Sequence, residues 1–295
     1  MTEGSSGGRS GGPDLCETAA IVSPWGGDRL VSRPSLDRAL QDRASNSGAN
    51  LIHGEVVCVE GVAGCWRLHL SSGQEIGASF VVDATGRARR MARQLGAKRA
   101  SRFDRLIAYQ AKLLCAWDAE AEASTYVLAD REGWWFIGPR HGDATSALFF
   151  TDSDLIGRTG LGKIAASWAR VRASLFQPAY LAEITAPHLA HSEALEQPWG
   201  AGWLAIGDAA AAFDPLSSSG LYFSQASAEW ASLAILSGDF LAYGEAVSGY
   251  IDGFLASRRR VYNGEQRFAD HAFWQRRQRG THPPTADLLE RERMQ

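Results

Sequence analysis

The segment Gly202–Leu236, GWLAIGDAAAAFDPLSSSGLYFSQASAEWASLAIL, constrains the fold more than any other part of the chain. An apolar run ends at Gly207 and Asp208, and small residues, an Asp-Pro pair and a Ser-Ser-Ser-Gly turn precede a helical pattern. Glycine and proline at these places favour tight turns, and the alanines let backbone or a ligand approach closely. The segment predicts a buried strand, a close turn and a helix that begins near Ser217 to Gly220.

The same turn predicts a binding place for an anion or an electron-rich ring edge. A helix that starts from serines and a glycine leaves backbone N–H groups and the positive end of its dipole available. Asp208, directly after the predicted strand, can accept hydrogen bonds from the hydroxyls of a sugar or polyol. Together these features describe a cofactor with hydroxyls and an acceptor edge that gains negative charge. The alternative is an ordinary strand-turn-helix connection with a capped helix.

One stretch upstream predicts a helix. Residues 30–49, LVSRPSLDRALQDRASNSGA, carry a Ser-Leu-Asp-Arg start at Ser35, apolar residues at helical spacing and a glycine stop at Gly48. We therefore expect a short amphipathic helix here.

The next segments predict strands. Glycines separate three extended segments, and the middle one alternates Trp66, Leu68 and Leu70 with polar residues, as a hairpin strand with one solvated face does. The run SFVVDATG, residues 79–86, is apolar up to its Asp-x-x-Gly, which predicts a buried strand followed by a tight turn. The arginine-rich RARRMARQLGA, residues 87–97, predicts a short helix whose arginines mostly form a solvated face.

The middle of the chain predicts an antiparallel sheet. Strand-like segments follow one another from about residue 105 to 191, with a helix only around residues 163–175. After Gly202 the pattern returns to strand, turn and long helix, and from Ala242 the chain is helical and charged. This order predicts an α/β chain with a sheet-rich part inserted between two strand-turn-helix segments.

Composition excludes several classes of protein. With 295 residues, 45% of them hydrophobic, the chain can form one large or two closely joined soluble domains. The net charge of -3 gives no reason to expect nucleic acid or an anionic membrane as a partner. Four cysteines without CxxC spacing argue against a zinc site or a disulfide framework. No stretch has the apolar length of a membrane helix and the first residues lack a signal-peptide core, so we expect a cytoplasmic protein.

Two further motifs carry less weight. His188 and His191 would share a metal only on a helix, but Pro187 precedes them and no carboxylate or cysteine completes a ligand set. Ser217 to Ser219 lie outside any GxSxG elbow, which argues against a hydrolase nucleophile. We therefore expect no metal site and assign no catalytic acid, base or nucleophile.

Three segments together resemble the FAD-dependent superfamily that includes para-hydroxybenzoate hydroxylase, geranylgeranyl reductases and flavin-dependent halogenases. The first is the Gly-Asp with its Pro-Leu-Ser-Ser-Ser-Gly turn, the second is DATGR at residues 83–87, and the third is LVSRPSLDRAL at residues 30–40. The resemblance implies that FAD is the cofactor, with the ribitol at Asp208 and the flavin ring edge at the turn. The residues implied to contact it are Arg33, Asp83, Thr85, Gly86, Arg87, Gly207, Asp208, Pro215, Ser218, Ser219, Gly220 and Leu221.

Within that superfamily the chain resembles the branch of tryptophan-halogenase type flavoproteins, including those that mature quinone-cofactor amine oxidases. GWWFIGPR, ALFFTDSDL and the tail RRRVYNGEQRFADHAFWQRR carry this likeness, which covers residues 28–279. It implies that Trp134, Trp135 and Phe136 form a substrate-pocket wall or pack beneath the flavin. The chain departs from the family in having no GxGxxG turn for the pyrophosphate, and we expect the first βαβ unit to be absent.

The resemblance implies an α/β fold with a Rossmann-like, three-layer FAD-binding domain, an inserted antiparallel substrate sheet and a helical C-terminus. The predicted boundaries are 1–28 for a flexible leader, 29–105 with 196–240 for the FAD-binding domain, 106–195 for the substrate sheet and 241–295 for the helical region.

The implied function is FAD-dependent oxidation, foremost NAD(P)H-linked monooxygenation of an aromatic or other electron-rich small molecule or of a peptide side chain. Two alternatives stay open. One is a truncated or degenerate flavoprotein fragment without catalytic activity. The other is a halogenase-like enzyme, against which stands the absence of the segment in which halogenases carry the lysine used for chlorine transfer.

Overall fold

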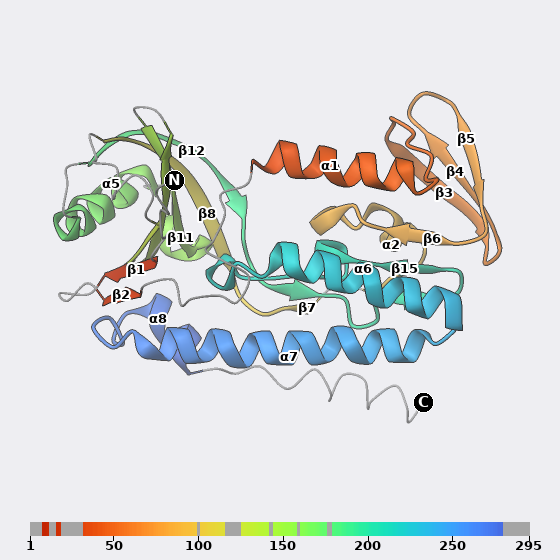
Figure 1. The fold of residues 1–295 in the computed structure, drawn as a ribbon. Helices are drawn as coiled ribbons and strands as arrows, with labels where there is room; N and C mark the ends of the chain where they lie inside the picture. The colour runs from red at the N-terminus through yellow and green to blue at the C-terminus, as the bar shows by residue number, and fades with distance from the viewer. Residues whose placement is uncertain are drawn as a thin grey trace.

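The computed structural model describes residues 8–11, 16–18, 32–98, 101–115, 125–141, 144–157, 160–175 and 179–279. Figure 1 shows two sheet-containing halves, with the long helix α7 (Phe240–Gly264) running beneath both of them. The mixed α/β architecture agrees with the fold class expected from the sequence.

A seven-stranded sheet forms one half. Its order is β12-β8-β11-β10-β9-β1-β2, and all neighbouring pairs are antiparallel except β1 with β9. The strands are β12 (Ala179–Leu189), β8 (Leu106–Cys115), β11 (Ala144–Asp152), β10 (Gly133–His141), β9 (Thr125–Asp130), β1 (Gly8–Gly11) and β2 (Cys16–Thr18). The antiparallel pairing of β8 to β12 confirms the expectation drawn from consecutive strands without helices.

Helices cover both faces of this sheet. Helix α5 (Gly160–Val171) lies on one face, preceded by α4 (Ser153–Ile156) and followed by the 3-10 turn η3 (Arg172–Ser174). Helix α8 (Ala272–Gln278) and the end of α7 lie on the other face. Because successive side chains of a strand point to opposite faces, the neighbours Trp134 and Trp135 of β10 enter two different cores.

The other half contains three small sheets. β14 (Trp199–Gly200), β15 (Trp203–Ala205) and β6 (Val81–Asp83) form one, in which β15 and β6 are parallel. The antiparallel sheet β3-β4-β5 (Val56–Val62, Cys65–Leu70 and Glu75–Ala78) and the sheet β16-β13-β7 (Ala211–Ala212, Glu193–Ala194 and Ser101–Arg102) complete it. The helical segments are α1 (Arg33–Asn46), η1 (Gly86–Ala88), α2 (Arg90–Gln94), η4 (Gly207–Ala209), η5 (Pro215–Ser217) and α6 (Gly220–Ser237).

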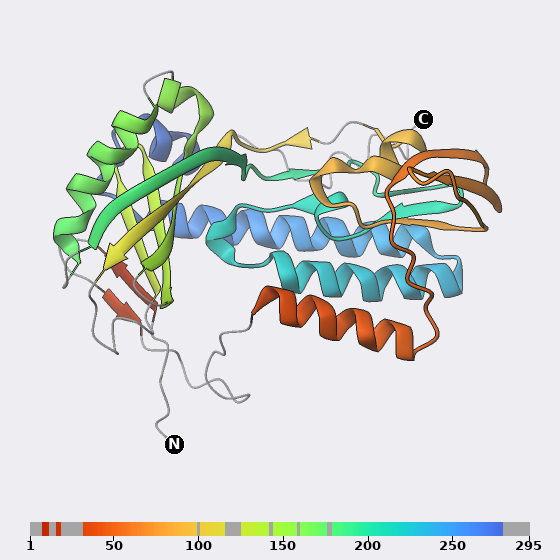
Figure 2. The ribbon, with the colours of Figure 1, turned by 90° about the horizontal axis from the view of Figure 1, so that it is seen from above.

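The axes of the long helices α1, α6 and α7 lie roughly parallel to one another along this half, as Figures 1 and 2 show. Helices α6 and α7 bury residues at helical spacing against the strands, among them Phe223 and Ala231 of α6 and Val247 and Ile251 of α7. The core of this half is therefore made by segments far apart in the sequence.

Helix α1 corrects two details of the sequence prediction. It begins at Arg33 with Ser32 as its N-cap, so Ser35 lies inside the first turn. Pro34 is tolerated there because the first N–H groups of a helix have no intrahelical acceptor. The helix buries no side chain, and Leu40 is 46% exposed, so the expected amphipathic packing is wrong.

The flexible leader expected for residues 1–28 is also wrong in part. Gly8–Gly11 and Cys16–Thr18 form β1 and β2, and β1 pairs with β9 at the edge of the large sheet. An edge strand presents unpaired backbone groups that can recruit a further strand whatever its side chains. The other residues of the expected leader lie outside the described residues.

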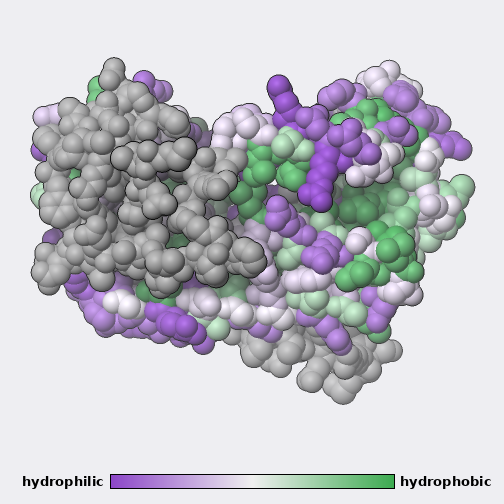
Figure 3. Space-filling view, viewed as in Figure 1, coloured by the Kyte–Doolittle hydropathy of each residue, from purple (hydrophilic) through white to green (hydrophobic). Residues whose placement is uncertain are grey.

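The strand β6 is less buried than its apolar sequence predicts. Val81 and Asp83 are buried, but Val82 between them is 42% exposed. In the described part of the chain β6 lies at the end of its sheet and pairs only with β15. Exposed apolar side chains are visible on this half of the molecule in Figure 3.

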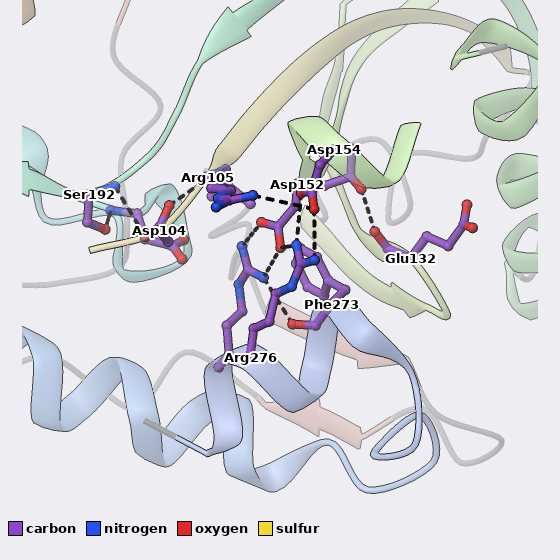
Figure 4. Close-up of polar contacts among 12 residues, drawn as sticks. Asp104, Arg105, Glu132, Asp152, Asp154, Ser192, Phe273 and Arg276 are labelled. Carbon is purple, nitrogen blue, oxygen red and sulfur yellow. Dashed lines mark hydrogen bonds and ion pairs between the residues drawn. The ribbon is translucent and has the colours of Figure 1, made fainter. Parts of the chain in front are cut away.

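Ion pairs fasten α8 to the large sheet. Arg277 is buried and donates to both carboxylate oxygens of Asp152, at 2.7 and 3.2 Å, and its guanidinium lies 3.6 Å from the centre of the Phe273 ring. Arg276 bridges Asp152 and the more exposed Asp154, as Figure 4 shows. The described C-terminal helix is thus attached through charges rather than through apolar contacts alone.

We predict that Asp152→Ala lowers the free energy of unfolding by about 3–5 kcal/mol, because it leaves Arg277 buried without its carboxylate. The matched change Asp154→Ala removes an exposed partner and is expected to cost about 0–1 kcal/mol. Urea unfolding of the two variants measures both values. Equal costs would show that the buried pair contributes no more than the exposed one.

Candidate functional site

A cleft of about 620 Å³ lies where the parallel strands β6 and β15 end and α6 begins. The carboxyl ends of parallel strands are the usual place for ligands in open α/β sheets. Of the twelve predicted cofactor residues, the cleft is lined by ten: Arg33, Gly86, Arg87, Gly207, Asp208, Pro215, Ser218, Ser219, Gly220 and Leu221. The structure thus brings together three sequence segments that the resemblance singled out.

Gly207 makes the first turn of the cleft. Its φ is 54°, a left-handed conformation that glycine adopts without strain. A Cβ atom there would lie 3.0 Å from Ser224 Oγ of α6, and the Gly207 N–H donates to Ser227 Oγ of the same helix at 2.9 Å. Helix α6 therefore packs directly against this turn, which fixes the start of the helix relative to the strand.

Asp208 presents its carboxylate to the cleft. Its side chain is 43% exposed, and its ion-pair partner is Arg87, with 4.0 Å between Asp208 Oδ2 and Arg87 Nε. A carboxylate has about four acceptor positions. Asp208 can therefore accept hydroxyl donors from a ligand while it remains near the arginine.

The beginning of α6 forms the opposite wall. Ser219 is its N-cap residue but makes no side-chain cap, and Gly220 has open space where a Cβ would stand. The first N–H groups of an α-helix lack intrahelical acceptors and carry the positive end of the dipole. This wall suits a ligand edge rich in hydrogen-bond acceptors.

Backbone strain gathers at the same place. Among the described residues, the non-glycine residues with positive φ are Arg89, at 49°, and Ser218, at 51°. Ser218 lines the cleft, and Arg89 lies directly behind it, donating to the carbonyl oxygens of Ala209 and Asp208. Such conformations persist only where surrounding contacts enforce them, and they cluster at functional sites.

Asp83 and Thr85 support the cleft from behind and do not line it. Asp83 is fully buried, and one of its oxygens accepts from the Thr85 N–H and hydroxyl, at 2.8 and 2.6 Å. Its other oxygen accepts from the N–H groups of Met91 and Ala92 at the start of α2. Asp83 therefore shapes the turn that presents Gly86 and Arg87.

A buried charge cluster stands behind Arg87. Glu193 Oε1 accepts from Arg89 at 2.6 Å, and its Oε2 lies 2.9 Å from His191 Nε2. Arg87 donates to the His191 carbonyl and lies 4.0 Å from Glu193. Burial lowers the pKa of the Arg87 guanidinium below its ordinary value, although the charges of Asp208 and Glu193 act in the opposite direction. Burial alone would raise the pKa of Glu193, but Arg89 and His191 hold it below its ordinary value.

Sequence reasoning missed this cluster. The arginines of residues 87–97 were expected to form mostly a solvated face, but Arg89 is only 2% exposed. Its carboxylate partner, Glu193, stands at a distant place in the sequence, so no local pattern predicts the pairing. The unusual density of arginines after DATG was the available signal.

The predicted pocket-wall residues lie in the large sheet and are not among the residues that line the cleft. The Trp134 ring stacks on Phe150, with centroids 4.1 Å apart, and the Trp135 indole donates to Ser167 Oγ of α5 at 2.9 Å. Both indoles are buried, so each forms part of a packed core in the structure. Phe136 is half-buried on the same face of the sheet as Trp134.

Two absences concern the described residues only. They contain no group of three or more His, Cys, Asp or Glu side chains that could hold a metal ion. In the same ranges, no helix has the length and apolar character needed to cross a membrane.

We predict that Glu193 contributes stability that disappears in acid. Because its pKa in the folded protein is depressed from 4.5, this stability is present above about pH 4.5 and is lost as the pH falls through the folded value. Glu193→Gln should therefore unfold more easily by about 2–4 kcal/mol at neutral pH, where it leaves Arg89 buried without its carboxylate. It should also lose less stability than the wild type on acidification, measured by urea unfolding across that range. A wild-type acid dependence in the variant would contradict the assignment.

Known proteins share sequence and fold with this chain. The family model for tryptophan halogenase matches residues 31–286. LodB of Marinomonas mediterranea, named as a putative FAD-dependent oxidoreductase, is 28% identical over 214 residues, which cover 69% of this chain and 57% of LodB. The chain thus spans little more than half the length of that relative.

Solved structures show the same fold. The flavin-dependent halogenase CmlS has a TM-score of 0.75 at 22% identity, with 99% of this chain and 58% of CmlS covered. QhpG, a peptidyl tryptophan dihydroxylase essential for tryptophylquinone cofactor biogenesis, has a TM-score of 0.67 at 22% identity, with 92% and 63% covered. The family match over most of the chain carries the identification: the chain belongs to the tryptophan halogenase family.

Proposed function

We propose that the protein is an FAD-dependent oxidoreductase whose cleft holds the ribitol and the pyrimidine edge of the flavin. The observation that carries the proposal is the cleft itself, where Asp208, the turn after Asp214 and the first turn of α6 converge. Family membership and the FAD-dependent oxidoreductase name of LodB support it.

The residues present fit the flavin half of FAD. Asp208 offers acceptors to the ribitol hydroxyls, and the uncapped start of α6 offers N–H donors and a positive dipole to an acceptor edge. The absence of a Cβ at Gly86 and Gly220, with open space at both, leaves room for close approach. Arg33 and Arg87 add positive charge at the rim.

FAD, when bound, supplies the hydride and oxygen chemistry, and the chain supplies binding and orientation. The reaction that we propose is monooxygenation of an aromatic or other electron-rich group, with NAD(P)H as the electron donor. A peptide side chain is the substrate class favoured by the likeness to QhpG, which acts on peptidyl tryptophan. Halogenation on the same cleft is the second candidate, favoured by the family match and the likeness to CmlS.

We predict that the purified protein mixed with FAD shows the visible absorbance of bound flavin and that Asp208→Ala weakens the affinity about tenfold, because a charged acceptor for hydroxyl donors is lost. Asp239→Ala is the control, since Asp239 caps α7 and does not line the cleft. Unchanged affinity in Asp208→Ala would show that the site is misplaced. No bound flavin at any FAD concentration would support the alternative of a flavoprotein fragment without catalytic activity.

A second measurement tests the electron donor. Anaerobic addition of NADPH or NADH to the FAD complex is expected to bleach the flavin band if the protein accepts hydride directly. Absence of bleaching would overturn direct NAD(P)H use. Product mass with bromide or chloride present then separates oxygen insertion from halogen transfer.

A further inference from the structure

We propose that Arg258 and Tyr262 of α7 are positioning residues of the cleft: through Asp214 they hold the Asp214–Gly220 turn in the shape that receives the flavin edge. The proposal rests on the proposed function and extends the site to a helix that does not line the cleft. It assigns to α7 a role in cofactor binding.

Asp214 is the point of attachment. It is among the residues that line the cleft, although only 1% of it is exposed. Its Oδ1 accepts from the Leu216 N–H at 3.0 Å, which caps η5 from inside the turn. Its Oδ2 accepts from Tyr262 Oη at 2.7 Å and from Arg258 Nε at 2.9 Å. One oxygen thus shapes the turn, and the other binds the turn to α7.

A closed ring of contacts strengthens this attachment. Arg258 also donates to Asp104 Oδ2 at 3.0 Å, and the Ser192 N–H donates to the same oxygen at 3.2 Å. Ser192 Oγ in turn accepts from the Asp214 N–H at 3.0 Å. Asp104 and Ser192, two of the residues labelled in Figure 4, belong to two described segments that run between the halves of the molecule, from β7 to β8 and from β12 to β13. The ring therefore fixes the turn relative to both connections.

Tyr262 extends the network to the large sheet. Its hydroxyl accepts from Trp134 Nε1 at 3.1 Å while it donates to Asp214. Burial, together with the Asp214 charge, raises the pKa of Tyr262 above its ordinary value, so the phenol keeps the proton that it donates. Trp134, which the resemblance places in a substrate-pocket wall or beneath the flavin, thus helps to orient this phenol.

The contacts of Arg258 and Tyr262 with Asp214 bear on the strained backbone of Ser218. A serine in the left-handed region costs about 1–2 kcal/mol and requires enforcement by its surroundings. Ser218 donates its N–H to the Pro215 carbonyl in the turn that Asp214 caps. Because Ser218 directly precedes the N-cap of α6, its conformation decides where the first N–H groups of that helix point. Contacts from α7 to Asp214 supply the enforcement.

Tyr262→Phe tests the proposal, because it removes the hydroxyl and keeps the ring. Tyr243→Phe is the matched control: it removes another buried hydroxyl of α7, which donates to the Ala205 carbonyl and not to the turn. We expect Tyr262→Phe to weaken FAD binding about tenfold and to shift the visible band of the bound flavin, and Tyr243→Phe to change the affinity less than about twofold. The FAD affinity and the spectrum are measured under conditions in which unfolding curves show that each variant is folded.

Wild-type affinity and spectrum in Tyr262→Phe would overturn the proposal, as would an equal loss in Tyr243→Phe. Arg258→Lys is the second variant, since lysine keeps the charge but has a single nitrogen in place of the Nε and Nη2 atoms that donate to Asp214 and Asp104. It is expected to weaken binding in the same direction, and unchanged binding would also count against the proposal.

Amide hydrogen exchange without FAD separates this proposal from the proposed function. Tyr262→Phe should exchange faster than wild type at residues 216–220, and Tyr243→Phe should not. If the wild type binds no FAD, the proposed function fails, and this exchange still decides whether α7 holds the turn. Unchanged exchange at residues 216–220 would overturn the positioning role.

Discussion

The geometry of the cleft depends on one buried carboxylate. Asp214 caps the turn through one oxygen and accepts from Arg258 and Tyr262 through the other. Asp214 is only 1% exposed, and burying an isolated charge costs much free energy. The hydrogen bonds from Arg258 and Tyr262 offset that cost. The strained Ser218 and the start of α6 follow directly from the place where this carboxylate is held.

The same solution recurs wherever parts of the chain that lie far apart in sequence meet. Glu193 joins Arg89 and His191 behind the cleft, and Asp152 joins Arg277 and Arg276 beneath the large sheet. Each buried carboxylate accepts hydrogen bonds from donors on another element. Because these bonds are directional, they fix the relative position of the two elements as well as holding them together. Apolar side chains form the cores of the two halves. The charge clusters fix the orientation of the turns and helices relative to those cores.

Local patterns predicted the parts of the site that are local. Gly207, the Pro-Leu-Ser-Ser-Ser-Gly turn and α6 could be recognised because glycine, proline and helical spacing act over a few residues. The roles of Arg89, Arg258 and Tyr262 could not, because their partners are brought near only by the fold. The adjacent Trp134 and Trp135 of β10 are a further example. The resemblance predicts one shared place for them, a pocket wall or the space beneath the flavin, but in the folded strand they point to opposite faces and pack into different cores.

The proposed place for the flavin part of FAD is this cleft. Electron density from crystals grown with FAD tests it most directly. We expect isoalloxazine density against the first turn of α6 and ribitol density beside Asp208. Flavin density elsewhere on the molecule, with this cleft filled by water, would contradict it.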